Sequence, residues 1–102
     1  MKRTICLLLS LQWVLLAHAQ LDTVRVLFLG NSYTAYNDLP GVLAEVAASL
    51  GVTLEATANT PGGATLQGHL SNATSISLIE QGVWDYVVLQ EQSQLHSFPD
   101  NQ

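Results

Sequence analysis

The regular alternation of strand-like and helix-like segments constrains the fold of this chain more than any other feature. Residues 24–29 form an almost uninterrupted apolar run, which is typical of a strand that is buried on both faces, and residues 86–89 form a second such run. Between them, residues 52–58 alternate apolar and polar side chains, as a half-exposed edge strand does. Strands that alternate with helices favour an α/β fold with a parallel sheet.

Two intervals between these strands are expected to be helical. In the first, Asp38 is a suitable N-cap, Pro40 lies in the first turn, and Gly51 closes the helix. Its apolar residues recur at helical spacing: Leu39, Val42, Leu43, Val46, Ala47 and Leu50. The second interval predicts a helical stretch from Ala64 and another short helix that resumes near Ile76, after a run of weak helix formers.

The expected topology places three polar segments together at the end of the sheet where its parallel strands finish. Right-handed crossovers restrict the strand orders that are available. The alternating strand goes to the edge and the two apolar strands go to the middle, which gives the order 2-1-3. The functional crevice of such a sheet lies beyond the carboxyl ends of its strands, where the strand order switches. Residues 31–32, 61–63 and 90–93 follow the three strands and are therefore expected to converge there.

The first 19 residues have the pattern of a secretory signal peptide. They combine a basic start, a short apolar stretch and a small-residue cleavage site that ends at Ala19. The alternative is an uncleaved N-terminal anchor, but the apolar stretch is short for a bilayer. Residues 1–19 thus predict a secreted or periplasmic protein that comprises residues 20–102. Cleavage would remove Cys6, the single cysteine, so no disulfide could form within the remaining chain.

The charge balance of residues 20–102 excludes several classes of partner. Arg25 is their single basic residue, and they carry all eight acidic residues of the chain. Such a chain has no electrostatic surface for nucleic acid or for anionic membranes, and no stable membrane insertion is expected. His69 and His96 share no metal-ligand spacing, so no metal and no other cofactor is implied. Both histidines are expected to be exposed and without a role.

Three motifs carry a resemblance to a known family. They are GNSYT at residues 30–34, PGGATL at residues 61–66 and VVLQEQS at residues 87–93. Together they resemble the blocks of the SGNH (GDSL-like) hydrolases, which are secreted esterases and lipases built on a flavodoxin-like sheet. Asn31 stands where that family usually has Asp, and the chain looks closest to a branch whose first block reads Gly-Asn-Ser. The resemblance spans about residues 24–95, so residues 20–102 would be the N-terminal part of such a domain, with three of five strands.

The resemblance assigns a role to several residues. Ser32 would be the nucleophile that attacks an ester carbonyl. The oxyanion would be bound by the N–H groups of Ser32 and Gly63 and by the side-chain amide of Gln92, with Gln90 as the second candidate for that amide. The alternative for Ser32 is an ordinary turn residue, and the two glutamines are equally compatible with solvated polar positions.

The general base of the family is missing from this sequence. SGNH hydrolases supply it from an Asp-x-x-His block, which does not occur here, and neither His69 nor His96 matches it. We therefore expect an N-terminal piece of a secreted esterase for carboxylic (acyl or acetyl) esters, or a pseudoenzyme, that is inactive alone. The alternative is a non-catalytic secreted α/β module that binds a small acylated or sugar ligand. A nucleotide-binding module is disfavoured, because residues 20–102 lack a lysine and a Gly-x-Gly-x-x-Gly turn.

Overall fold

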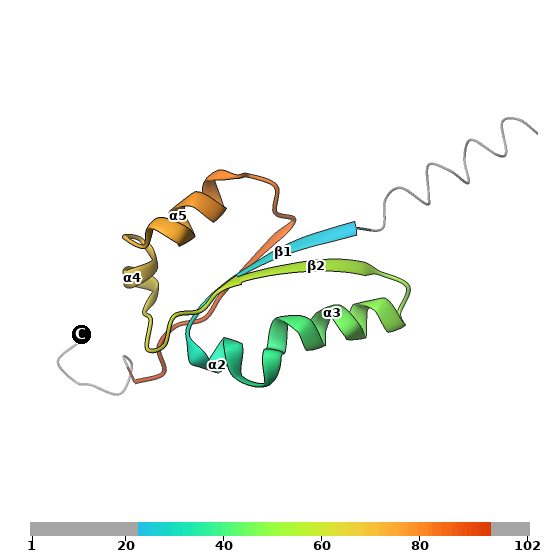
Figure 1. Cartoon of the computed structure of the whole chain (residues 1–102), viewed down its shortest axis with the longest axis horizontal. Helices are drawn as coiled ribbons and strands as arrows, with labels where there is room; N and C mark the ends of the chain where they lie inside the picture. The colour runs from blue at the N-terminus through green and yellow to red at the C-terminus, as the bar shows by residue number, and fades with distance from the viewer. Residues whose placement is uncertain (1–22, 95–102) are drawn as a thin grey trace, which may run out of the picture.

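The structure is a computed structural model that describes residues 23–94. Its elements follow in the order β1 (Thr23–Leu29), α2 (Ser32–Ala35), the 3₁₀ helix η1 (Tyr36–Asp38), α3 (Leu39–Ser49), β2 (Thr53–Asn59), α4 (Leu66–His69), α5 (Ala73–Glu80) and β3 (Tyr86–Leu89) (Figure 1). The predicted signal peptide lies outside the described residues.

The three strands form one parallel sheet in the order β2-β1-β3. In its register, Leu27 of β1 lies between Thr57 of β2 and Val87 of β3. Helix α3 packs on one face of the sheet, and α4 and α5 lie on the other (Figure 1). Right-handed crossovers produce this division, because the chain moves to one side of β1 and then to the other. The predicted α/β class and strand order are confirmed.

The buried apolar core of the described chain lies in β1. Its four buried apolar residues are consecutive: Val26, Leu27, Phe28 and Leu29. The expectation that the third strand also lies in the middle of the sheet is wrong for the described residues. Strand β3 lies at an edge, and its side chains range from 40% exposed at Val88 to 66% exposed at Tyr86. No strand within residues 23–94 pairs with its outer edge, so β3 is left open.

Helix α3 forms as its sequence predicts. The Asp38 carboxylate accepts a hydrogen bond from the N–H of Gly41 at 3.3 Å, and Pro40 occupies the first turn. Gly51 ends the helix with a φ of 81°, a conformation that glycine adopts without steric cost. In the following interval, α5 begins at Ala73, three residues before the predicted restart at Ile76, because the side chain of Asn72 caps it.

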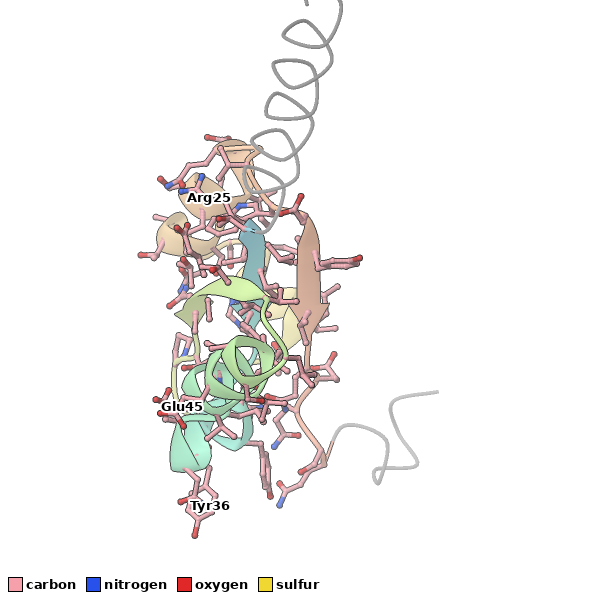
Figure 2. The ribbon with its side chains drawn as sticks, turned by 90° about the vertical axis from the view of Figure 1, so that its right-hand side faces the viewer. Arg25, Tyr36 and Glu45 are labelled. Atoms are coloured by element: carbon pink, nitrogen blue, oxygen red, sulfur yellow. The ribbon has the colours of Figure 1, made fainter. Side chains whose placement is uncertain are left out.

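The segment between β1 and α3 is more structured than the predicted polar connection. It forms α2 and η1 and then turns through two left-handed residues, Asn37 and Asp38, with φ values of 54° and 51°. Asn and Asp tolerate this conformation better than most residues do. Figure 2 shows Tyr36, in this segment, pointing away from the sheet at the opposite end of the molecule from Arg25. Between residues 23 and 94, no helix combines the length and the apolar character needed to cross a membrane.

Candidate functional site

Asn31 joins the three polar segments that follow the strands. Its side chain is buried, with 1% of its surface exposed. Its backbone N–H donates to the side-chain oxygen of Gln90 at 3.0 Å, and its Nδ2 donates to the carbonyl oxygen of Ala64 at 3.1 Å. The segment after β1 is thus bonded to those after β2 and β3, as the topology predicts.

The same asparagine also starts the helix that carries Ser32. The Oδ1 atom of Asn31 accepts a hydrogen bond from the N–H of Tyr33 at 3.0 Å, which makes Asn31 the N-cap of α2. Ser32 is the next residue, and it is exposed at the carboxyl end of the central strand. The buried Asn31 cap therefore fixes the start of α2, while the neighbouring Ser32 is exposed.

Gly30 is required by the close packing of this turn. A Cβ atom at Gly30 would lie 2.6 Å from Oε1 of Gln90 and 2.6 Å from Oγ1 of Thr34, which is too close for a carbon atom. The glycine therefore allows the segment after β3 to approach the backbone of β1.

Gly63 lies in an exposed turn beside the carbonyl group that Asn31 binds. The N–H of Ala64 donates to the carbonyl of Pro61 at 3.1 Å and closes the turn, in which Gly63 has a φ of 70°. Apart from Gly63 itself and its two chain neighbours, no described residue has an atom within 4 Å of the position that a Cβ of Gly63 would take. The turn that contains this predicted oxyanion donor is thus tied to the Ser32 turn through Asn31.

Gln90 has a contact that its predicted role did not include. Its Oε1 accepts hydrogen bonds from the Asn31 N–H and from Oγ1 of Thr34, the latter at 2.8 Å, while its Nε2 donates to the Glu91 carbonyl at 2.6 Å. The oxygen of this amide therefore holds the Ser32 turn in place, and one of the two N–H groups of its Nε2 is occupied.

Gln92, the preferred candidate for the oxyanion amide, lies in a local turn after β3. Its N–H donates to Oε1 of Glu91 at 2.7 Å, and its side-chain oxygen accepts from the N–H of Gln94 at 2.6 Å. The same Glu91 oxygen accepts from the N–H of Leu66, the first residue of α4, at 3.0 Å. The carboxylate thereby anchors the turn that carries Gln92 to the helix beside it.

His69 is buried, which corrects the expectation that it is exposed. Only 5% of its surface is exposed to solvent, and both ring nitrogens have hydrogen-bond partners. Nε2 lies 2.8 Å from the carbonyl oxygen of Gly30, and Nδ1 lies 2.7 Å from Oγ of Ser75. A ring that is occupied at both nitrogens is not available as a base for Ser32. No local pattern indicates this burial, because Gly30 lies 39 positions earlier in the chain. His96 lies outside the described residues.

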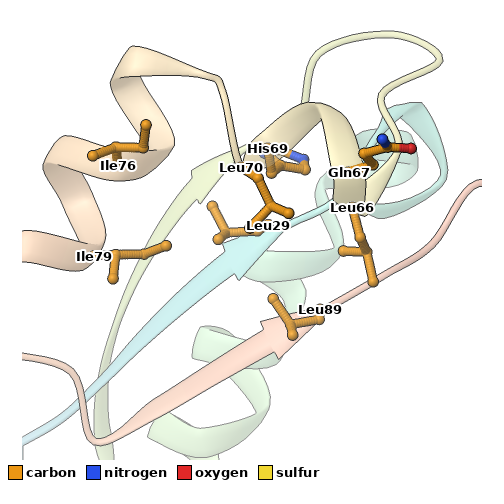
Figure 3. A pocket seen from close by; sticks show the side chains of 8 residues that line it. All are labelled: Leu29, Leu66, Gln67, His69, Leu70, Ile76, Ile79 and Leu89. Carbon is orange, nitrogen blue, oxygen red and sulfur yellow. The ribbon is translucent and has the colours of Figure 1, made fainter.

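An open apolar cavity of about 440 Å³ lies beside His69, between the two short helices and the ends of β1 and β3. The strands contribute Leu29 and Leu89, and the helices contribute mainly Leu66, Leu70, Ile76 and Ile79 (Figure 3). Among the described residues, no Asp, Glu, Lys or Arg side chain lines it, so it suits hydrocarbon rather than an ion. In the part of the chain that the structure describes, no three His, Cys, Asp or Glu side chains cluster closely enough to hold a metal.

No family model, curated protein or solved structure matches this chain. The resemblance to SGNH hydrolases rests on the three motifs alone.

Proposed function

We propose that this chain supplies the nucleophile and the oxyanion donors of an SGNH-type serine esterase that acts on carboxylic esters, and that it lacks the general base. The observation that carries the proposal is the convergence of three loops on Asn31, which leaves Ser32 exposed beside it. A nucleophile at the carboxyl end of a central parallel strand is accessible to a ligand in the crevice of the sheet.

In the proposed reaction, the Ser32 oxygen attacks the acyl carbonyl and its proton passes to a base. The tetrahedral intermediate then expels the alcohol, and water hydrolyses the acyl-serine. The N–H groups of Ser32 and Gly63 would bind the oxyanion together with the amide of Gln92, or of Gln90 in its place. One such donor typically lowers the barrier by about 3 kcal/mol. Since His69 is occupied at both nitrogens, the described residues do not show a base for the first step.

A fluorophosphonate probe, with imidazole as an external base, tests this proposal. The site of labelling is mapped by peptide mass spectrometry. We expect Ser32 to be labelled faster than the exposed Ser71 and Ser77, and we expect imidazole to accelerate that labelling selectively. Ser32→Ala should abolish the selective label, whereas Ser71→Ala should preserve it. Equal labelling of all three serines would overturn the esterase proposal.

Hydrolysis of p-nitrophenyl acetate without imidazole provides a second measurement. Because the base is missing, the chain should hydrolyse this ester no faster than its Ser32→Ala variant. A clear excess over the variant would show that a base is present, and His96 would be the first residue to replace.

The apolar cavity favours a second candidate, a non-catalytic module that binds a small acylated ligand. A volume of about 440 Å³ is within the usual range for ligand pockets. A fluorescent fatty-acid probe should then bind, and Ile76→Lys should weaken its binding because Ile76 lines the cavity. Val42→Lys, on α3 and on the other side of the sheet, is the matched control and should bind as the parent does. Failure of the parent chain to bind the probe would reject this candidate.

A further inference from the structure

We propose that His69 is a positioning residue, which holds the Gly30–Asn31 peptide group and thereby sets the position of Ser32. Its importance for reactivity rests on the proposed esterase function, but the positioning itself can be measured without any activity.

The Gly30–Asn31 peptide group is held at both ends by side chains from other segments. Its carbonyl oxygen lies 2.8 Å from Nε2 of His69, on α4. Its N–H donates to Oε1 of Gln90, after β3, at 3.0 Å. Two side chains thus fix the orientation of this peptide plane from opposite ends. Because Ser32 follows directly, the orientation of the plane determines where the backbone of Ser32 begins.

The hydrogen-bond partners determine the tautomer of His69. The Gly30 carbonyl can only accept, so Nε2 must carry the hydrogen. With hydrogen on Nε2 alone, Nδ1 is an acceptor, and it accepts from the hydroxyl of Ser75 at 2.7 Å. The Ser75 oxygen in turn accepts from Nδ2 of Asn59 at 2.8 Å. The donors therefore run in one direction, from Asn59 through Ser75 and His69 to Gly30.

The two hydrogen bonds of His69 are buried, the Asn59–Ser75 bond is partly buried, and each step is anchored to regular structure. Ser75 is 0% exposed and lies in α5, and Asn59 is the last residue of β2. Asn59 Nδ2 also donates to Oδ1 of Asn72, the cap of α5, at 3.0 Å. Figure 3 shows His69 on α4, near the end of β1. Because its supports lie on β2 and α5, the His69 ring has a fixed orientation relative to the sheet.

The geometry of His69 fits a role in positioning the backbone before Ser32 and does not fit a role as the base that accepts the Ser32 proton. A general base needs a free ring nitrogen directed at the nucleophile. Both nitrogens of His69 are occupied and the ring is buried, whereas Ser32 is exposed. His69 therefore acts on Ser32 through the backbone.

The tautomer provides the first test. Long-range ¹H–¹⁵N correlation spectra of the labelled parent chain should show hydrogen on Nε2 of His69. Hydrogen on Nδ1 alone would overturn the proposal, since Nε2 could then not donate to Gly30. This measurement needs neither a variant nor a substrate.

Substitution of His69 provides the second test. His69→Leu removes the donor, whereas His69→Gln retains an N–H that can reach the Gly30 carbonyl. We expect amide hydrogen-exchange protection of Asn31 to fall on the order of fivefold in His69→Leu and to be largely restored in His69→Gln. Protection of Leu27, in the middle of β1, should stay unchanged and shows that the sheet is intact. If His69→Leu leaves the sheet and Asn31 protected as before, the proposal is wrong. Should His69→Leu fail to fold, Ser75→Ala is measured in its place, with the same expectation for Asn31.

Labelling of Ser32 links the positioning to the proposed chemistry. Imidazole-assisted labelling by the fluorophosphonate should fall on the order of tenfold in His69→Leu and recover in His69→Gln. Unchanged labelling in a folded His69→Leu variant would contradict the role in reactivity. If the parent Ser32 is not labelled at all, the esterase proposal fails, while the tautomer and exchange results still decide the positioning role.

Discussion

Strands β1 and β3 have the same kind of sequence but opposite environments. They are register partners over four positions, from Val26 and Tyr86 to Leu29 and Leu89. The partners in β1 are at most 4% exposed, whereas those in β3 are at least 40% exposed. Strand β1 has a neighbour on each edge and helices over both faces, while β3 has one neighbouring strand within residues 23–94. An apolar run therefore indicates that a strand is suited to burial on both faces. Whether the strand is buried depends on the strands and helices that surround it in the fold.

The largest difference in the cost of a substitution is expected between two leucines that are register partners on β1 and β3. Leu29→Ala, in β1, removes a side chain that is 2% exposed and should lower the free energy of unfolding by roughly 2–5 kcal/mol. Leu89→Ala, in β3, removes one that is 59% exposed and should cost less than about 1 kcal/mol. Urea unfolding followed by circular dichroism compares the two directly. Equal costs would mean that β3 is as well packed as β1.

A smaller effect is expected where β1 and β3 end. Gly30→Ala places a methyl group against Gln90 and Thr34, and we expect it to cost roughly 1–3 kcal/mol. Gly62→Ala, in an open turn with no atom within 4 Å of the new carbon, should be neutral or slightly stabilising. Thermal unfolding of both variants measures the difference. A neutral Gly30→Ala would show that the segment after β3 is not held against β1.

The smallest effect on stability is expected at the open edge of the sheet. Val87→Lys should change the free energy of unfolding by less than about 1 kcal/mol, because Val87 is 47% exposed. It should nevertheless reduce concentration-dependent association in light scattering, since an exposed apolar edge strand favours edge-to-edge pairing. Thr53→Lys, on the opposite edge strand β2, is the matched control and should leave association unchanged. Equal association of the parent and Val87→Lys would mean that the chain does not associate through the β3 edge.

Local patterns predicted most of the regular structure. The apolar runs, the alternating strand and the spacing of α3 gave the three strands, the parallel order and a helix between Asp38 and Gly51, all of which the structure confirms. These features depend on neighbours within one or two turns of chain. The short helix α2 was not predicted, because four residues carry too little periodicity to be recognised.

The site was predicted less completely, because its contacts join distant residues. The topology placed Ser32 and the segments after β2 and β3 at one edge, and their hydrogen bonds to Asn31 agree with that. The burial of His69 had no local signal, because its partners come from a strand end and from another helix. The hydrogen bond from the Asn31 N–H to the Gln90 oxygen was likewise not predicted, since Asn31 lies 59 positions earlier in the chain. The catalytic assignments themselves stay predictions.

The attachment of β3 also has a consequence for the order of folding. At its start, the N–H of Asp85 donates to the Arg25 carbonyl at 2.8 Å, and the Arg25 N–H donates back to the Asp85 carboxylate at 2.8 Å, across 60 positions. The β1–α3–β2 unit closes a loop about half as long and gains the pairing of all seven residues of each strand. We therefore expect this unit to assemble first and β3 to join it last. In refolding followed by pulsed hydrogen exchange, the amides of β2 should gain protection before those of β3.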